Sequence, residues 1–428
     1  MNEAFAAYLA TYRAVEERFY GEVARWGLAF EDAESSPRVE RLEPRSWLAC
    51  ENGGASLRRG FMSPACKACR RAERTETFFV SLRCTRSCYF CFNPNQEGYD
   101  YFRTHRHNIA AELRRAHEAG ARFDYLAVTG GEPALELPAV LAFLRAAREL
   151  YPHAEVRLYT SGDLLDEEAL VALGTAGLAE VRFSVKPEAG EDDYRHVLET
   201  MGRALLRIPR VLVEMPAIPG TDAWMERLLL DLDRIGVHGI NLLEFCFPFH
   251  NAREFERRGF RLRRRPYDPL YDYWYAGGLP IAGSERLCLD LLAFAQERGL
   301  RLGVHYCSLD NKHTGQVYRQ NLPHATAFPT CLLSERDCFL KSYKAFGEDA
   351  AAVRRVLASA DPELHRVGGE APYIDFHPAL VEAVRDALPD IDLGLCRHVV
   401  EEREGGAVLR ELSVEPLRCV DAPSAERL

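Results

Sequence analysis

The sequence predicts an α/β fold, a partial (β/α)6 TIM-like barrel with a cysteine-containing N-terminal extension and a small C-terminal α+β segment. Short apolar runs alternate with amphipathic stretches between residues 77 and 245, and the connections between them are short. Regular βα alternation builds a parallel sheet with helices outside it. Six such units favour an incomplete barrel or a strongly curved open sheet, whose site lies at the carboxyl ends of the strands.

The elements of this core follow one another in a simple order. The expected strands are apolar runs at residues 78–82, 125–128, 156–159, 181–185, 211–213 and 240–243. The expected helices follow them at residues 106–119, 138–150, 167–174, 191–206 and 222–235. A helix at 284–298 and a strand at 302–305 resume the core after a segment rich in aromatic, Arg and Pro residues.

The pattern changes at both ends of this core, which predicts three regions. Residues 1–76 form an N-terminal helix and a cysteine-containing extension, residues 77–339 form the barrel with an insertion at 247–283, and residues 340–428 form the C-terminal segment. Apolar residues at helical spacing from Phe5 to Phe19 predict the leading helix. A hairpin is expected in the last region, with residues 399–402 and 408–412 joined by a turn at Gly405 and Gly406.

Bulk properties exclude several classes of function. The 428 residues carry a net charge of -10, so the chain as a whole has no basic balance for binding nucleic acid. It has no apolar run of about 18 residues that would span a membrane. The first ten residues include Glu3 and lack the basic and apolar regions of a signal peptide, which predicts a cytoplasmic protein.

Thirteen cysteines need an explanation in such a protein. Disulfides do not persist in a reducing compartment, so clustered cysteines there indicate metal or redox ligands. The isolated ones are expected to be small buried apolar residues.

One cysteine loop carries a specific chemistry. Cys84, Cys88 and Cys91 form a C-x3-C-x2-C pattern directly after the first expected strand, and Phe90 puts an aromatic ring beside the last of them. Three thiolates can hold a cubane [4Fe–4S] cluster and leave its fourth iron without a protein ligand. That open iron can bind a chelating substrate.

This loop resembles that of the radical S-adenosylmethionine (SAM) superfamily, and the Gly-Gly-Glu-Pro segment after the second strand is similar to a motif of the same family. The resemblance covers roughly residues 77–245. It implies that SAM chelates the open iron, and that its reductive cleavage gives methionine and a 5′-deoxyadenosyl radical. It also implies a one-electron donor such as flavodoxin or ferredoxin. The implied residues for the SAM amino group are Gly130, Gly131, Glu132 and Pro133.

Weaker strand-end features extend the resemblance. Thr160 and Ser161 match a Thr-Asn-Gly turn of the family, with Ser161 in place of Asn. Ser184 and Lys186 end the fourth strand, where the family often has polar groups for the ribose or the carboxylate. Glu214 on the fifth strand and residues 243–245 after the sixth are similar to segments near the adenine. A zinc ribbon, made by Cys66 and Cys69 with Cys84 and Cys88, is the alternative reading, but it leaves Cys91 and the Gly-Gly-Glu-Pro segment unexplained.

A second metal site is predicted from the remaining cysteines. Cys66 and Cys69 form a C-x2-C loop, and Cys50 adds a third thiol from the same extension. Cys307, at the end of a core strand, is the expected fourth ligand, and Cys331 and Cys338 are its rivals. The site would hold an auxiliary iron–sulfur cluster or a structural zinc, and the alternative is a set of cysteines without metal.

Three further segments contain residues that suit a substrate. The polar segment 307–316 includes Lys312 and His313, which could bind a polar substrate or simply face solvent. The arginines at positions 261 and 263–265 suit either phosphate groups or a solvated surface. The aromatic residues between positions 267 and 275 could line a pocket or pack against the barrel.

Three functions remain open at this point. The first is a radical SAM enzyme that abstracts hydrogen from a small molecule or a natural-product intermediate. The second is the modification of a peptide or protein, including glycyl-radical activation, for which a second cysteine cluster is typical. The third is a non-enzymatic iron–sulfur or zinc scaffold. The sequence shows no Asp-x-His-x-x-Gly pattern, which disfavours a cobalamin-dependent methylase.

Overall fold

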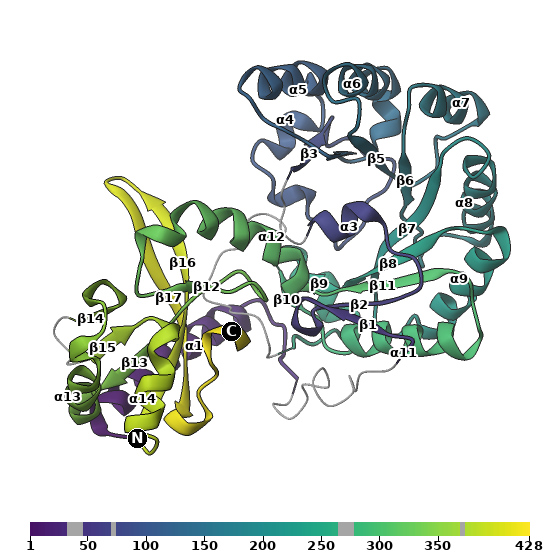
Figure 1. Ribbon diagram of the computed structural model, residues 1–428. Helices are drawn as coiled ribbons and strands as arrows, with labels where there is room; N and C mark the ends of the chain where they lie inside the picture. The colour runs from purple at the N-terminus through teal and green to yellow at the C-terminus, as the bar shows by residue number, and fades with distance from the viewer. Residues whose placement is uncertain (32–45, 70–73, 264–277, 369–372) are drawn as a thin grey trace. The chain divides into compact units, whose positions relative to one another are not determined.

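The computed structural model describes residues 1–31, 46–69, 74–263, 278–368 and 373–428 (Figure 1). These residues form two compact units. One comprises Met1–Trp26 and His313–Leu428, and the other comprises Gly27–Arg264 and Tyr273–Lys312. Residues 1–76, treated above as one region, are shared between the two units, because the leading helix α1 (Glu3–Ala24) belongs to the C-terminal unit.

The larger unit contains a nine-stranded sheet with the order β1-β2-β11-β8-β7-β6-β5-β4-β3. Neighbouring strands from β3 to β11 pair in parallel. The parallel strands are β3 (Thr75–Phe79), β4 (Tyr125–Thr129), β5 (Glu155–Thr160), β6 (Glu180–Phe183), β7 (Arg210–Ala217), β8 (Gly239–Glu244) and β11 (Gly303–Cys307). The predicted α/β fold with a parallel sheet is therefore confirmed. Among the described residues the sheet stays open, because β1 and β3 form its two edges.

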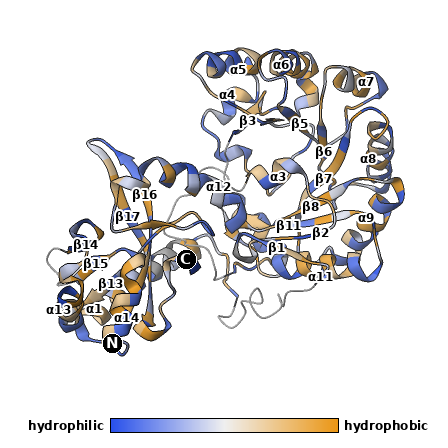
Figure 2. Ribbon diagram, viewed as in Figure 1, coloured by the Kyte–Doolittle hydropathy of each residue, from blue (hydrophilic) through white to orange (hydrophobic). Residues whose placement is uncertain are grey.

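The helices lie outside the curved sheet (Figure 1). Figure 2 shows polar and apolar residues side by side on these helices, as expected for helices with one face in the core. Asn108 and Asp166 cap two of them by accepting a hydrogen bond from the third helical residue. The helices are α5 (Ile109–Glu118), α6 (Leu137–Leu150), α7 (Glu167–Thr175), α8 (Glu191–Ala204), α9 (Asp222–Ile235) and α11 (Ser284–Glu297).

The two faces of the sheet have opposite chemistry, because side chains alternate along each strand. On β6, Val181 and Phe183 belong to the main hydrophobic core, whereas Glu180 and Arg182 form ion pairs with each other and with neighbouring strands. On β5, Leu158 belongs to the same core. The concave face of the sheet is thus lined by charged and polar groups.

The extension before the core adds a β-hairpin and a short helix that the sequence did not predict. Strands β1 (Ala49–Glu51) and β2 (Ser56–Arg59) form a hairpin, and β2 pairs antiparallel with β11. A short helix, α3 (Pro64–Cys69), then lies inside the curve of the sheet (Figure 1). Ser63, just before it, donates a 2.7 Å hydrogen bond to Glu180 on β6. The extension therefore reaches the concave face.

The first core strand begins and ends three residues before its predicted position. Residues 80–82 belong to the predicted apolar run but follow β3. Val80 still donates to Thr129, but Leu82 donates to Phe102 instead of to a strand partner. The apolar run at 78–82 thus marks a buried segment, whereas the hydrogen-bonded strand β3 ends at Phe79.

The predicted insertion is described at its two ends. It forms β9 (Cys246–Phe247), α10 (Ala252–Arg257) and β10 (Leu279–Pro280), and β10 pairs antiparallel with β9. A small helix, α4 (Tyr99–Phe102), follows the cysteine loop. After β11, helix α12 (Leu309–Asn321) begins within two residues.

The smaller unit is an antiparallel sheet with the order β14-β15-β13-β16-β17, and β12 pairs with β13. The predicted hairpin is present and longer than expected, since β16 and β17 pair from Asp392–Arg418 to Arg403–Gly406. Its remaining elements are β12 (Leu332–Leu333), β13 (Leu340–Phe346), α13 (Gly347–Val356), β14 (His365–Val367), β15 (Tyr373–Phe376), α14 (Val381–Ala387), β16 (Asp392–Arg403) and β17 (Gly406–Arg418). No helix of the described residues is long and apolar enough to cross a bilayer.

Candidate active site

The cysteine loop lies at the carboxyl edge of the sheet, directly after β3. Backbone N–H groups face two of its sulfurs, since Arg86 N donates to Cys84 Sγ at 3.4 Å and the N–H of Asn93 donates to the Cys91 sulfur. Burial raises the pKa of Cys91, and the Cys88 and Cys84 thiols raise it further, so the three side chains share one region. Lys186 acts in the opposite direction on Cys84 and Cys91. The thiols, the N–H donor and the cation suit a thiolate-bound anionic cluster.

The two glycines of the Gly-Gly-Glu-Pro segment bring the next strand into contact with this loop. Gly131 N donates to Ser81 O at 2.9 Å, and Glu132 N donates to Arg83 O at 2.7 Å. A Cβ at Gly131 would lie 1.8 Å from the Arg83 oxygen, and one at Gly130 would lie 2.3 Å from the Ser81 oxygen. Only glycine fits this close approach of two backbones, so the segment is fixed to the start of the cysteine loop.

The Glu132 carboxylate is 1% exposed and fully hydrogen-bonded within the chain. One oxygen accepts from Thr160 Oγ1 at 2.8 Å and from Ala134 N at 3.0 Å. The other accepts from Ser161 N and Ser161 Oγ, both at 2.6 Å. In this structure Glu132 therefore braces the turn after β5. The predicted contact of the Gly-Gly-Glu-Pro segment with the SAM amino group stays a prediction.

The fourth-strand residues lie beside the same loop. Lys186 Nζ donates to Ser184 Oγ at 2.5 Å and lies 5.8 Å from the centre of the Phe90 ring. Phe90 in turn makes an edge contact with Phe245, which follows β8. The structure thus brings together Phe90, Ser184, Lys186 and the residue after the sixth strand.

Glu214 lies in a different group, on the concave face with the second set of cysteines. Arg182 Nη1 and Asn241 Nδ2 donate to its Oε2 at 2.6 and 2.8 Å. Burial alone would raise the pKa of Glu214, but Arg182 and Asn241 hold it below its usual value. The described contacts of Glu214 are those of a buried ion pair and include none to the cysteine loop.

The described part of the insertion covers the cysteine loop with aromatic rings and hydrogen bonds. Tyr89 packs against Phe255 and Phe260. His250 Nε2 bonds to Cys91 O at 2.6 Å, and Asn251 Nδ2 donates to Tyr89 O at 3.0 Å. These contacts fix the backbone that carries the thiols.

Replacing His250 by phenylalanine should therefore loosen the loop. One lost hydrogen bond costs about 1 kcal/mol, so we expect a chelator to remove iron from the His250→Phe variant about fivefold faster. The His250→Gln variant keeps a donor and should remain close to the wild type. Equal rates of iron loss in all three proteins would show that this contact does not hold the loop.

Three cysteines of the second set converge on the concave face. Cys66 Sγ accepts hydrogen bonds from Arg182 Nη2 at 3.3 Å and from Asn241 Nδ2 at 3.2 Å. Cys307 Sγ accepts from Asn311 Nδ2 at 3.2 Å. Burial raises the pKa of Cys307 to about 12, and the thiols of Cys69 and Cys66 both contribute to this rise. Cys66, Cys69 and Cys307 therefore lie close enough for their charges to interact.

Cys50 does not point to this group. In β1 it pairs with Leu57, which in turn pairs with Tyr306, and both partners are fully buried in the core. Cys307 pairs with Ser56, so it projects from the opposite face of the same sheet. The rivals Cys331 and Cys338 are buried in the C-terminal unit.

A buried guanidinium without a full set of partners faces the second cysteine set. Arg157 Nε donates to Tyr159 OH at 3.2 Å, but its Nη1 is buried and has no hydrogen-bond partner in the part of the chain that the structure describes. The Cys69 and Cys66 thiols help to raise the pKa of Arg157 against the opposing effect of burial. Arg157 was missed by sequence reasoning, and its only signal was a charged residue within an apolar strand.

The arginine-rich segment is described only in part. Arg263 is 6% exposed and forms ion pairs with Glu244 and Glu285, so it is a buried structural residue and not part of a solvated surface. Residues 264–265 and the aromatic residues at 267–275 lie outside the described residues. The polar segment after Cys307 forms the first turns of α12.

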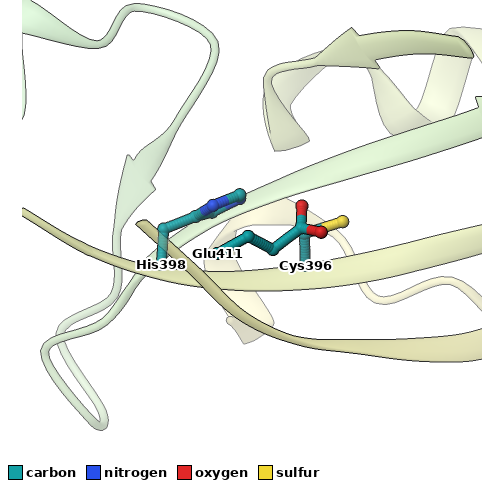
Figure 3. Close-up of side chains that lie close together, drawn as sticks. All are labelled: Cys396, His398 and Glu411. Carbon is teal, nitrogen blue, oxygen red and sulfur yellow. The ribbon is translucent and has the colours of Figure 1, made fainter. Parts of the chain in front are cut away.

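A further cluster of ligand-type side chains lies in the C-terminal unit. Cys396, His398 and Glu411 bring one ligand atom each within 4.8 Å of the others (Figure 3). However, Glu411 already forms an ion pair with Lys344 and accepts from Tyr8 OH at 2.6 Å. Because the ammonium of Lys344 already neutralises Glu411, this cluster is a buried ion pair that joins α1 to the sheet.

Comparisons with known proteins agree with the geometry of the loop. The model of the radical SAM superfamily matches residues 78–232. Residues 78–232 therefore form a domain similar to the radical SAM superfamily. A protein of Methanocaldococcus jannaschii described as a putative glycyl-radical enzyme activating enzyme is 24% identical over 298 residues, which is 68% of this chain and 72% of that protein. The matched domain and this relative indicate that the chain is an enzyme.

Two solved structures resemble part of the fold. SuiB of Streptococcus suis, bound to its precursor peptide SuiA, is 13% identical, with 54% of this chain and 48% of that chain covered and a TM-score of 0.41. Coproporphyrinogen III oxidase of Escherichia coli is 15% identical, with 56% and 57% covered and a TM-score of 0.36. The chain spans about half the length of these structures.

Proposed function

We propose that this radical SAM enzyme abstracts hydrogen from a small-molecule or natural-product substrate. The observation that carries the proposal is the bonding of three strand ends into one site. The cysteine loop after β3, the Gly-Gly segment after β4 and the Thr160–Ser161 turn after β5 are joined by the hydrogen bonds of Gly131 and Glu132. Such preorganisation is what a site needs to fix a reactive cofactor.

Cys84, Cys88 and Cys91 would hold the [4Fe–4S] cluster. When bound, the cluster and SAM supply a 5′-deoxyadenosyl radical and methionine. The chain's own residues would orient SAM. Because Glu132 is saturated, the SAM amino group would be bound by backbone carbonyls of Gly130 and Gly131, and Lys186 with Ser184 would bind the carboxylate. Thr160, Ser161 and Pro133 would shape the turn around it.

The covering of the site supports a small substrate. Helix α3 packs on the concave face, and the insertion packs on the cysteine loop through Tyr89 and His250. A small molecule fits a site covered on both sides better than a folded protein does.

Activation of a glycyl-radical enzyme is the second candidate, because the archaeal relative carries that description. The two are separated by incubating the reduced enzyme and SAM with a glycyl-radical enzyme, or with a small-molecule extract. A glycyl-radical signal in electron paramagnetic resonance favours activation. Formation of 5′-deoxyadenosine that is stimulated only by the small-molecule fraction favours the first proposal.

We also propose a second metal site made by Cys66, Cys69 and Cys307. Arg157 supports it, because its Nη1 has no hydrogen-bond partner among the described residues and a buried cation beside thiols favours their charged, metal-binding form. Either an auxiliary iron–sulfur cluster or zinc fits three thiolates and one open position.

Metal analysis tests this second site. After anaerobic reconstitution, the Cys66→Ser/Cys69→Ser variant should contain about four irons fewer per chain than the wild type if the site holds a cubane, or one zinc fewer if it holds zinc. Cys50→Ser is the matched control and should keep the full content, because Cys50 faces away from the set. An unchanged content in the double variant would refute the site.

The proposed chemistry also requires an electron donor and a reducing compartment. Reductive cleavage needs one electron, so we propose a flavodoxin- or ferredoxin-type donor. A cluster held by thiolates persists in a reducing compartment, which supports a cytoplasmic location.

A further inference from the structure

Lysine is a rare residue in this chain, with five lysines among 54 lysine and arginine residues. Lys341 and Lys344 are buried and paired with Asp337 and Glu411. Lys67 is exposed between Cys66 and Cys69. The remaining two, Lys186 and Lys312, both lie over aromatic rings of the cysteine loop.

The backbone of Lys312 is held firmly at the carboxyl edge of the sheet. Its N–H donates to Ser308 O at 3.1 Å in the first turn of α12. The preceding residue, Asn311, accepts from Asn52 at 2.9 Å and donates to Cys307 Sγ at 3.2 Å. This anchoring fixes the direction from which the lysine side chain reaches the site.

The ammonium group of Lys312 lies beside the proposed cluster and SAM site. Its Nζ is 5.2 Å from the centre of the ring of Phe92, which directly follows the cluster ligand Cys91. The next residue, Asn93, donates to Gly130 O at 3.0 Å. The charge of Lys312 is also the largest influence opposing the burial that raises the pKa of Cys246 to about 12.

The Lys312 ammonium has no paired counter-charge among the described residues. Lys312 is half-buried, and the described residues provide no carboxylate that forms an ion pair with it. Glu244, which acts on Cys246 in the opposite direction to Lys312, pairs with Arg263. A partly desolvated cation without a counter-charge favours an anionic ligand.

We propose that Lys312 binds a carboxylate or phosphate group of the substrate, so that the substrate of this enzyme is an anionic small molecule. The inference rests on the proposed function and narrows its substrate class. The ammonium would hold the anionic end of the substrate at the strand edge where the loop, Phe92 and Gly130 meet. A lysine suits this role as a compact point charge that accepts either kind of anion.

Amine footprinting tests the proposal without knowledge of the substrate. The reconstituted holoenzyme is acetylated briefly under anaerobic conditions, and the modification of each lysine is read by mass spectrometry. The probes are acetate, succinate, citrate and inorganic phosphate. We expect at least one probe to slow the labelling of Lys312 threefold or more and to leave exposed Lys67 unchanged. Protection by carboxylates alone or by phosphate alone assigns the anionic group, and protection by none of the four overturns the proposal.

A second measurement separates binding from folding and from the proposed function. Calorimetry with the protecting probe should show binding to the wild type, to Lys312→Arg and to the control Lys67→Gln, and at least a tenfold weaker binding to Lys312→Gln. Equal binding by Lys312→Gln would refute the assignment. If Lys312 is protected but the wild type forms no 5′-deoxyadenosine, the anion site stands and the proposed function fails.

Discussion

Replacing Cys88 by alanine should abolish 5′-deoxyadenosine formation, with a loss of about 10²-fold or more. The loop supplies three thiolates within eight residues, and each would be a ligand of the cluster. Without Cys88 the cluster loses a ligand, and SAM loses the iron that would hold it. The measurement is the amount of 5′-deoxyadenosine after reduction of the anaerobically reconstituted variant with SAM.

The control for this prediction is Cys50→Ala, which removes one exposed thiol outside the loop. Cys50 projects from the face of the sheet opposite to that of Cys307, so this variant should form 5′-deoxyadenosine at the wild-type level. If Cys88→Ala retains activity, or if Cys50→Ala loses it equally, the loop is not the site of SAM cleavage.

Replacing Arg182 by methionine should destabilise the larger unit by about 3–5 kcal/mol, the usual effect of removing one partner of a buried ion pair. Arg182 is 3% exposed and bonds to Glu180 at 2.6 Å and to Glu214 at 2.6 Å. The variant leaves both carboxylates without this cation. Because the chain has two compact units, hydrogen exchange of the strands β5 to β8 is the suitable measurement. We expect exchange to become about 10²- to 10³-fold faster, since ~1.4 kcal/mol corresponds to a factor of ten.

The stability difference between the wild type and Arg182→Met should depend on pH. Arg182 lowers the pKa of both Glu180 and Glu214, against the opposing effect of burial. A carboxyl with a lowered pKa stabilises the folded state above its unfolded value of about 4.3 and loses that contribution as the pH falls further. The difference between the wild type and Arg182→Met should therefore shrink as the pH falls below about 4. The exposed Arg195→Met variant should match the wild type, and a loss of stability there equal to that of Arg182→Met would contradict the argument.

The sequence predicted those parts of the molecule that follow from local periodicity. The apolar runs at 125–128 and 240–243 appear as β4 and β8, and the helix at 222–235 has the predicted ends. These segments bury one face of the chain with a regular spacing, which is visible in a single sequence. The turn at Gly405 and Gly406 was equally readable, because both glycines adopt positive φ angles.

The parts that the sequence did not predict depend on contacts between distant segments. Helix α3 is too short for a periodic signal, and its place follows from bonds of Ser63 and Cys66 to the concave face. Cys50 and Cys66 look alike in the sequence, but the alternation of β1 turns Cys50 away. Glu132 was recognisable as part of a motif, whereas its four hydrogen bonds come from elements that only the fold brings together.

The most direct test of the central claim is SAM cleavage by the wild-type chain. The protein is reconstituted anaerobically with iron and sulfide, reduced by one electron, and incubated with SAM, and methionine and 5′-deoxyadenosine are quantified over time. The account predicts that the two products appear in equal amounts and only after reduction. If the reconstituted and reduced protein binds iron but leaves SAM intact, the site built from Cys84, Cys88, Cys91 and the Gly-Gly-Glu-Pro segment does not perform the chemistry proposed for it.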